Sequence, residues 1–164
     1  MFTDIFQISL AAATLASGLV AGVFLTFSDF VMRSLERAGP SAGIKAMQMI
    51  NREVYRSLFM ALLIGMAVVS VGLALTGVVF IGGAAAAWLT AATGAYLAGV
   101  MAVTARANVP MNQRLDREYP DSDAARALWK TYLRDWTRWN HLRTVASAGA
   151  MLCFFAASLT VAAT

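Results

Sequence analysis

The sequence is poor in cysteine, in histidine and, over long stretches, in charge. Its 164 residues include one cysteine and one histidine. A single cysteine, Cys153, cannot form an intramolecular disulfide or a cysteine-based metal site, so we interpret it as a small apolar packing residue. One histidine without a cluster of carboxylates argues against a transition-metal centre built from protein side chains. We therefore expect no metal site and no protein-bound cofactor.

Three stretches carry no charge at all. They lie between Asp4 and Asp29, between Arg56 and Arg106, and after Arg143, and they hold 24, 49 and 21 residues. A helix needs about 20 apolar residues to cross the hydrocarbon core of a bilayer, so the gaps predict one, two and one crossings. The expected fold is all-α: an integral membrane four-helix bundle that forms a single domain over residues 1–164. The expected spans are at about 2–30, 57–78, 84–107 and 141–161.

All thirteen Lys and Arg residues lie in two stretches, five in residues 33–56 and eight in residues 106–143. With four spans, both stretches lie on one side of the inner (plasma) membrane, and the positive-inside rule makes that side cytoplasmic. Both termini and the Gly82-Gly83 connection then lie outside. No soluble module with a basic, aromatic-interleaved stripe is present, so nucleic acid is not an expected partner. The expected partners are the lipid bilayer and a small hydrophobic ligand. Assembly into a homo-oligomer through the small residues of span one stays open.

Proline and capping residues predict where the helices begin and end. Helix two is expected to start near Ala42 with Ser41 as its cap, and to run unbroken through Tyr55 to Leu75. Helix three is expected to stop at Asn108-Val109-Pro110, because proline disfavours helix in the preceding residue. A polar connection, Met111 to Pro120, follows, and Asp121-Ser122-Asp123 supplies caps for helix four. Helices two and four thus extend into the cytoplasm.

Small and polar residues recur at helical spacing in each span and predict four packing faces. These are Gly18, Gly22, Thr26 and Asp29; Gln48, Asn51 and Tyr55, in line with Ile44 and Leu58; Gly94, Ala98, Met101, Ala105 and Asn108; and Trp129, Trp136, Asn140 and Arg143, with Tyr132 and Trp139 beside them. The faces bring amides, aromatic rings and an arginine to the cytoplasmic mouth of the bundle, where Asn112 can fold over. Such a cluster suits a small, flat, poorly soluble ligand.

A purely structural interpretation stands beside the functional one. Asp29 and Arg143 lie near span ends, where charge costs far less than at the bilayer centre, and they can form an ion pair. Amides cap helix ends, and Trp and Tyr form interfacial belts. In a straight helix His141 lies about 100° from Asn140 and points to a neighbouring helix or to headgroups.

Four segments of the chain resemble the anthrone oxygenase-like family, also called the domain of unknown function 1772 family, of small four-span membrane proteins. They are Gly22-Val23-Phe24-Leu25-Thr26-Phe27-Ser28-Asp29-Phe30-Val31-Met32, Met47-Gln48-Met49-Ile50-Asn51, Asn108-Val109-Pro110-Met111-Asn112 and Trp136-Thr137-Arg138-Trp139-Asn140-His141-Leu142-Arg143-Thr144. Fungal members of this family look like monooxygenases that convert anthrones to anthraquinones. The resemblance therefore implies a reaction class, with dioxygen as co-substrate, but no particular substrate.

Oxidation of an anthrone needs a base, donors for an oxyanion, an aromatic slot and access for oxygen, and no metal or flavin. Asp29 or His141 is the expected base. The expected oxyanion donors are Arg143, Asn51, Asn108 and Asn140, and the stacking rings are Trp136, Trp139 and Tyr55. Gln48 and Asn112 complete the expected binding residues. The alternative is a non-enzymatic quinone- or lipid-binding protein or a small-molecule carrier, because no nucleophile–base pair or phosphate loop is visible.

Overall fold

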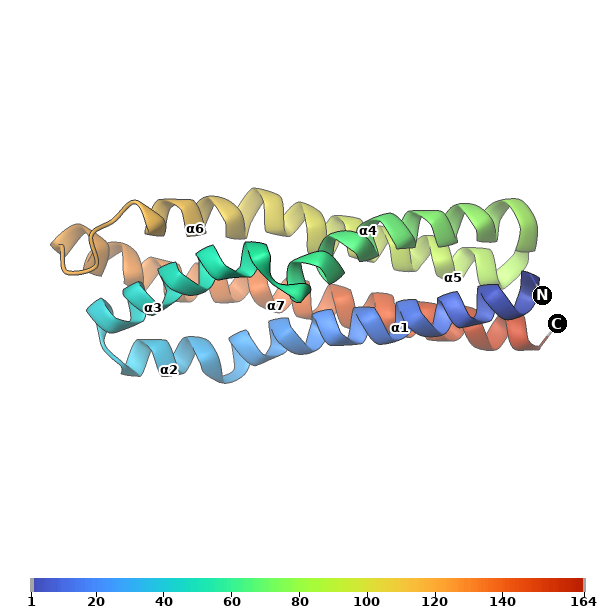
Figure 1. Ribbon diagram of the computed structural model, residues 1–164, viewed down its shortest axis with the longest axis horizontal. Coiled ribbons are helices and arrows are strands. Elements are labelled where there is room, and N and C mark those ends of the chain that lie inside the picture. Colours follow the sequence, from blue (N-terminus) through green and yellow to red (C-terminus); the bar gives the residue numbers. More distant parts are fainter. Residues whose placement is uncertain (1, 164) are drawn as a thin grey trace.

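The computed structural model describes residues 2–163. They form four long helical rods, packed side by side in one elongated bundle, with no strand among the described residues (Figure 1). The all-α four-helix bundle is therefore confirmed. Each rod includes a helix that is long and apolar enough to cross a membrane.

Three of the four rods consist of several helical segments in series. The first rod contains α1 (Phe2–Thr26), a π-helical turn (Phe27–Val31) and α2 (Met32–Arg37). The second contains α3 (Pro40–Glu53), a 3₁₀ turn (Val54–Arg56), α4 (Leu58–Thr76) and a π-helical turn (Gly77–Ile81). The third contains α5 (Gly83–Gly94), two π-helical segments (Ala95–Ala102 and Thr104–Asn108) and α6 (Val109–Asp116). The fourth is one helix, α7 (Asp123–Ala162).

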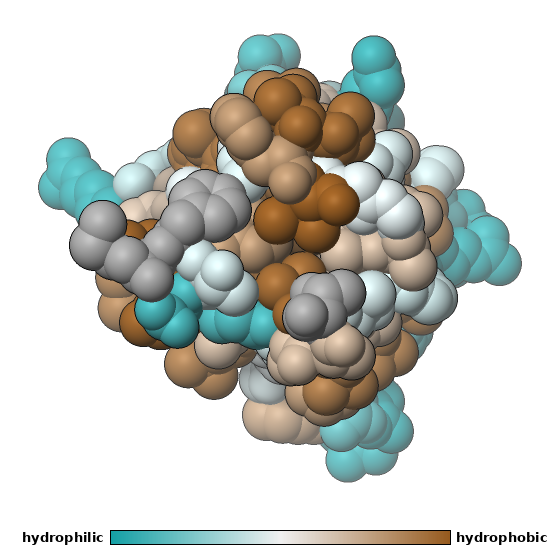
Figure 2. Space-filling view, turned by 90° about the vertical axis from the view of Figure 1, so that its right-hand side faces the viewer, coloured by the Kyte–Doolittle hydropathy of each residue, from teal (hydrophilic) through white to brown (hydrophobic). Residues whose placement is uncertain are grey.

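The two ends of the bundle differ in the chain segments that lie there. Both termini and the α4–α5 connection lie at one end, and the α2–α3 and α6–α7 connections lie at the other (Figure 1). The terminal end is largely apolar or weakly polar (Figure 2). At 40 residues, α7 is about 60 Å long, twice the roughly 30 Å of a bilayer core. The bundle therefore projects well beyond one face of a membrane, and which face is cytoplasmic stays a prediction.

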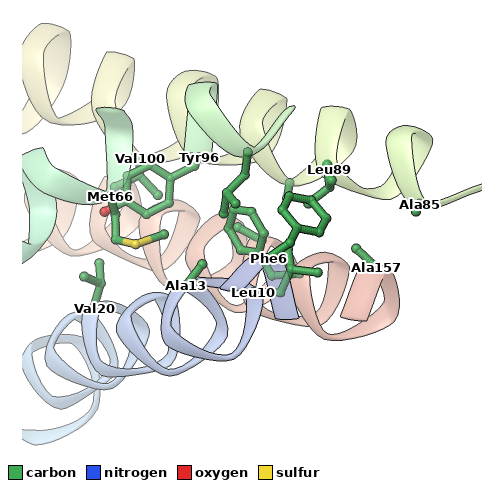
Figure 3. Close-up of a cluster of buried hydrophobic side chains, with 14 of the residues drawn as sticks. Phe6, Leu10, Ala13, Val20, Met66, Ala85, Leu89, Tyr96, Val100 and Ala157 are labelled. Carbon is green, nitrogen blue, oxygen red and sulfur yellow. The ribbon is translucent and has the colours of Figure 1, made fainter. Parts of the chain in front are cut away.

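The core divides into two clusters along the bundle axis. In the terminal half, Phe6 and Leu10 of α1 meet Leu89 of α5, Tyr96 of the following π-helical segment and Ala157 of α7 (Figure 3). The other half is built around aromatic side chains of α7, packed on Ile44 and Met47 of α3 and on Leu115 of α6. Large apolar side chains elsewhere on the rods point outward, as expected where lipid replaces water.

Several expected helix boundaries are wrong. The N-cap of α3 is Gly39, with φ of 88°, and Pro40 is its first residue, so Ser41 is not the cap. Helix two is not continuous: Ser57 is extended and caps α4 by accepting a hydrogen bond from the Met60 amide at 3.2 Å. Pro110 does not stop the third rod. It lies at the start of α6, where the amide proton that proline lacks is not needed.

The polar connection expected over Met111–Pro120 is therefore helical up to Asp116. The cap predicted for the fourth helix is confirmed. The Ser122 hydroxyl accepts a hydrogen bond from the Ala125 amide at 3.0 Å.

Two of the four predicted packing faces are also wrong. On the first rod Gly22 and Asp29 are exposed, and on the third rod Gly94 and Ala98 are exposed. The buried side of the third rod instead carries Leu89, Ala92, Tyr96, Val100 and Asn108. On both rods the error lies within regular helix, because Gly22 belongs to α1 and Gly94 to α5, and glycines at helical spacing also occur on the outward side of a rod. The faces predicted on α3 and α7 are buried, except for Tyr55 and Leu58, which are exposed next to the break at Ser57.

Candidate functional site

The four rods enclose one cavity near the level of the Ser57 break. Its apolar walls come from the first three rods: Phe24, Phe27, Met47, Ile50, Val54, Phe59, Met60, Leu63 and Val109. Its other lining residues are Asn51, Tyr55, Thr104, Asn108, Asn112, Trp136, Asn140 and Arg143. Seven of the eleven residues predicted for the site therefore line one cavity: Asn51, Tyr55, Asn108, Asn112, Trp136, Asn140 and Arg143.

The cavity measures about 80 Å³, less than the several hundred Å³ typical of ligand pockets. A three-ring aromatic needs the side chains at its mouth to move. Tyr55 is suited to such movement, because it lies in the 3₁₀ turn next to the break and is 57% exposed.

Arg143 is the charged residue of this cavity. Only 6% of its surface is exposed. Its guanidinium carbon lies 4.3 Å from the centre of the Phe24 ring and 5.2 Å from that of Trp136, so cation–π attraction offsets part of the lost hydration. Among residues 2–163, no Asp or Glu side chain forms an ion pair with it. The expected ion pair between Asp29 and Arg143 is therefore wrong.

Asn140 fixes the position of Arg143. Its amide nitrogen donates to the Phe24 carbonyl and to the Ser28 hydroxyl, both at 2.6 Å, and its side-chain oxygen accepts from Arg143 Nη2 at 2.6 Å. Arg143 Nη1 also donates to the Thr104 hydroxyl at 3.4 Å. These partners are neutral, so they hold the guanidinium in place without cancelling its charge.

Two buried polar atoms at the cavity have no partner among the described residues. They are Nε of Arg143, a donor, and the side-chain oxygen of Asn108, an acceptor. The Asn108 amide nitrogen donates to the Trp136 carbonyl at 3.3 Å, which fixes the direction of the side chain. A buried polar atom without a partner is costly, so both atoms are suited to a polar group of a ligand or to water.

Asn112 organises the mouth of the cavity. Its side-chain oxygen accepts from the Tyr132 hydroxyl at 2.8 Å and from Trp136 Nε1 at 2.9 Å. Asn51 donates to the same hydroxyl at 3.5 Å. The rings of Trp129, Tyr132 and Trp136 stack in sequence along α7. The predicted fold-back of Asn112 over the mouth thus occurs, through α6 rather than through a loop.

Four predicted site residues lie outside the cavity. Asp29 is exposed and pairs with Arg33 at 3.0 Å, so it does not face a partner helix. His141 is exposed in a separate groove between the first rod and α7. Trp139 is 44% exposed. Gln48 is buried and donates to the Leu115 and Glu118 carbonyls, both at 2.9 Å, which joins α3 to the end of α6.

No site role was predicted for the apolar wall residues of the cavity, or for Phe24, Ser28, Thr104 and Tyr132, although Tyr132 was placed beside the predicted face of α7. Thr104 lies four residues before Asn108, and Tyr132 lies four residues before Trp136, so one further step of four along each face finds them. Nothing in the hydropathy pattern of the first span distinguishes Phe24 or Ser28 from their neighbours.

No group of three His, Cys, Asp or Glu side chains gathers anywhere in residues 2–163. The cavity lining, made of amides, hydroxyls, aromatic rings and one guanidinium, suits an organic ligand with an oxygen substituent.

Comparison with known proteins gives one match. The model of a family described as anthrone oxygenase matches residues 47–153. The matched region includes every cavity residue from the second, third and fourth rods, and it leaves out those of the first rod. No curated protein and no solved structure matches the chain.

Proposed function

The chain belongs to the anthrone oxygenase family, and from this premise we propose that it is a membrane-embedded oxygenase. Its substrate in this proposal is a small, planar phenolic compound such as an anthrone, which it oxidises to the quinone with dioxygen. The observation that carries the proposal is a buried guanidinium at the wall of an aromatic cavity, held by neutral partners. Such a group stabilises negative charge that develops on a bound ring system.

The reaction balances without a further oxidant. The methylene group of the anthrone loses a proton to water at the mouth of the cavity, and the resulting carbanion forms a C–O bond with dioxygen. Protonation gives a hydroperoxide. Loss of the second C–H proton and cleavage of the O–O bond then release water and leave the quinone carbonyl. One dioxygen is consumed and one water is formed for each quinone.

The cavity residues have separate roles in this proposal. Arg143 holds the oxygen on which the charge of the carbanion is delocalised, and Asn140 positions Arg143. Phe24 and Trp136 flank the rings. Dioxygen is apolar enough to enter from the lipid, and the route needs no metal or flavin.

Oxygen uptake tests the proposal. The purified full chain in detergent, supplied with emodin anthrone, should consume oxygen and form quinone in a one-to-one ratio, well above the rate without protein. Arg143→Ala should lower the rate by about 10²-fold, the cost of losing one preorganised oxyanion donor. Asn140→Ala should also lower the rate, because Arg143 loses the partner that positions it. Arg138→Ala is the matched control, because Arg138 lies on the same helix and its side chain is 74% exposed.

Full quinone formation by folded Arg143→Ala would refute the role of this residue. The alternative function is a carrier or quinone-binding protein, because no Asp, Glu or His of residues 2–163 lines the cavity. Binding of the anthrone with no oxygen uptake, together with its flux across proteoliposomes, would establish that alternative instead.

A further inference from the structure

Arg143 is a positive charge enclosed in the bundle without a negative partner. Among the described residues, no carboxylate and no second cation lines the cavity with it. Transferring an ion out of water costs several kcal/mol unless another charge or hydrogen bonds compensate. Here the compensation comes from two aromatic rings and two neutral oxygens, and Nε remains without a partner.

The cavity also has no base to generate an anion from a neutral ligand. The two candidate bases lie elsewhere: Asp29 is paired with Arg33 on the outer surface, and His141 lies in a separate groove. The cavity and its mouth instead carry two tyrosine hydroxyls, those of Tyr55 in the 3₁₀ turn and of Tyr132 on α7.

Water can reach the mouth of the cavity. A smaller hollow between α3 and α6 shares Asn51, Tyr55 and Asn112 with the cavity, and Arg52, Gln113 and Asp116 also line it. Arg52 and Asp116 form an ion pair across this hollow at 2.8 Å, and both are partly exposed. A proton lost by a ligand at the mouth therefore has a route to water.

From these observations we infer that the cavity is a receptor for the conjugate base of a weakly acidic, planar aromatic ligand, with Arg143 as its counter-ion. The ligand hydroxyl gives its proton to water at the mouth, and the aryloxide oxygen then lies against the guanidinium. The protein thus favours the ionised ligand through charge rather than through a base. This inference takes the aromatic class of the ligand from the proposed function, but it does not require that oxidation occurs.

The probe for this inference is 2-hydroxyanthraquinone, which is already oxidised and whose absorption moves to longer wavelength on ionisation. It is titrated with pH in the presence of the purified full chain in dodecyl maltoside, and separately in micelles without protein. Quenching of tryptophan fluorescence reports binding, because Trp136 lines the cavity. The apparent pKa of the bound dye should be at least about one unit below its value in empty micelles, since an opposite charge within 4–6 Å shifts a pKa by about that much or more.

Three variants locate the source of the shift. Arg143→Met should abolish it while the shape of the side chain is nearly kept. Thr104→Asp should also reduce it, because a carboxylate next to Arg143 Nη1 supplies an internal counter-ion. Arg138→Met, on the exposed side of α7, should leave the shift in place.

An unchanged pKa of the dye bound to the native protein overturns the inference, and so does a shift that survives in folded Arg143→Met. Absence of dye binding also overturns it. The measurement on the native protein needs no variant to fold. A protein that lowers the dye pKa but consumes no oxygen with emodin anthrone sustains the anion receptor and refutes the oxygenase, so the two proposals fail separately.

Discussion

At the scale of single residues, one amide oxygen joins two helices, α6 and α7, at the cavity mouth. Asn112 on α6 accepts hydrogen bonds from two buried donors of α7, the Tyr132 hydroxyl and Trp136 Nε1. Asn112→Ala leaves both donors without this partner, at about 1–3 kcal/mol for each unsatisfied group. We expect a loss of about 2–4 kcal/mol in the free energy of unfolding, measured by circular dichroism during denaturation in detergent.

The control for this prediction is the adjacent exposed residue. Gln113→Ala should change the free energy of unfolding by less than about 0.5 kcal/mol, as surface substitutions usually do. Tyr132→Phe should cost less than Asn112→Ala, because it removes a donor and leaves Asn112 bonded to Trp136. Equal unfolding curves for the Asn112 and Gln113 variants would mean that the network adds no stability.

The sequence predicts the polar cavity residues of α3 and α7 well because both segments are regular helices there. Asn51, Trp136, Asn140 and Arg143 follow α-helical spacing, and they line one cavity. Asp29 fails because it was placed on the same face as Gly22, and that face is outward on the first rod. His141 was expected to point away from Asn140, and its place in a separate groove confirms that direction.

At the scale of helices, the close approach of the third rod to α7 depends on Gly99. A Cβ atom at Gly99 would overlap the Cβ of Ala146, whereas a Cβ at Gly94 meets nothing within 4 Å. Gly99→Ala should therefore cost about 1–3 kcal/mol through overpacking. Gly94→Ala should be neutral or stabilising by up to about 1 kcal/mol, because alanine is the better helix former. Thermal unfolding of the two variants measures the difference.

A compensating change makes this test specific. The double variant Gly99→Ala with Ala146→Gly returns the lost space and should recover most of the stability, apart from the cost of a glycine within α7. If the double variant is less stable than both single variants, the two residues do not form the contact that limits this approach.

The same pair of glycines shows why the buried face of a helix is harder to predict than the presence of the helix. Hydropathy alone indicates a helix able to cross a membrane, and four such helices are present among residues 2–163. The choice between Gly94 and Gly99 depends on which side of the third rod packs on α7. A glycine that faces outward and one that faces a neighbouring helix are identical in composition, so hydropathy does not distinguish them. The break at Ser57 was missed for a similar reason, since one serine between Arg56 and Leu58 is compatible both with a helix interior and with an N-cap.

At the scale of the whole molecule, the charges divide the bundle into two unlike ends. The α2–α3 and α6–α7 connections belong to the stretches that hold all thirteen Lys and Arg residues, whereas the end with the termini and the α4–α5 connection has almost none. The cavity opens, through the hollow between Asn51 and Asp116, at the side of the charged end. If that end is cytoplasmic, the proton that a ligand releases at the mouth enters the cytoplasm.

Cysteine labelling determines the orientation. In a Cys153→Ser background, Ala84→Cys places a thiol at the terminal end and Asp121→Cys places one before α7, both at exposed positions. A membrane-impermeant maleimide should label Ala84→Cys in intact cells and Asp121→Cys only after permeabilisation, because clustered Lys and Arg are retained on the cytoplasmic side. The reverse pattern would invert the bundle and send the released proton outward. Labelling of both thiols in intact cells would contradict the single crossing predicted between residues 84 and 121, since the two ends of the bundle would then share one side of the membrane.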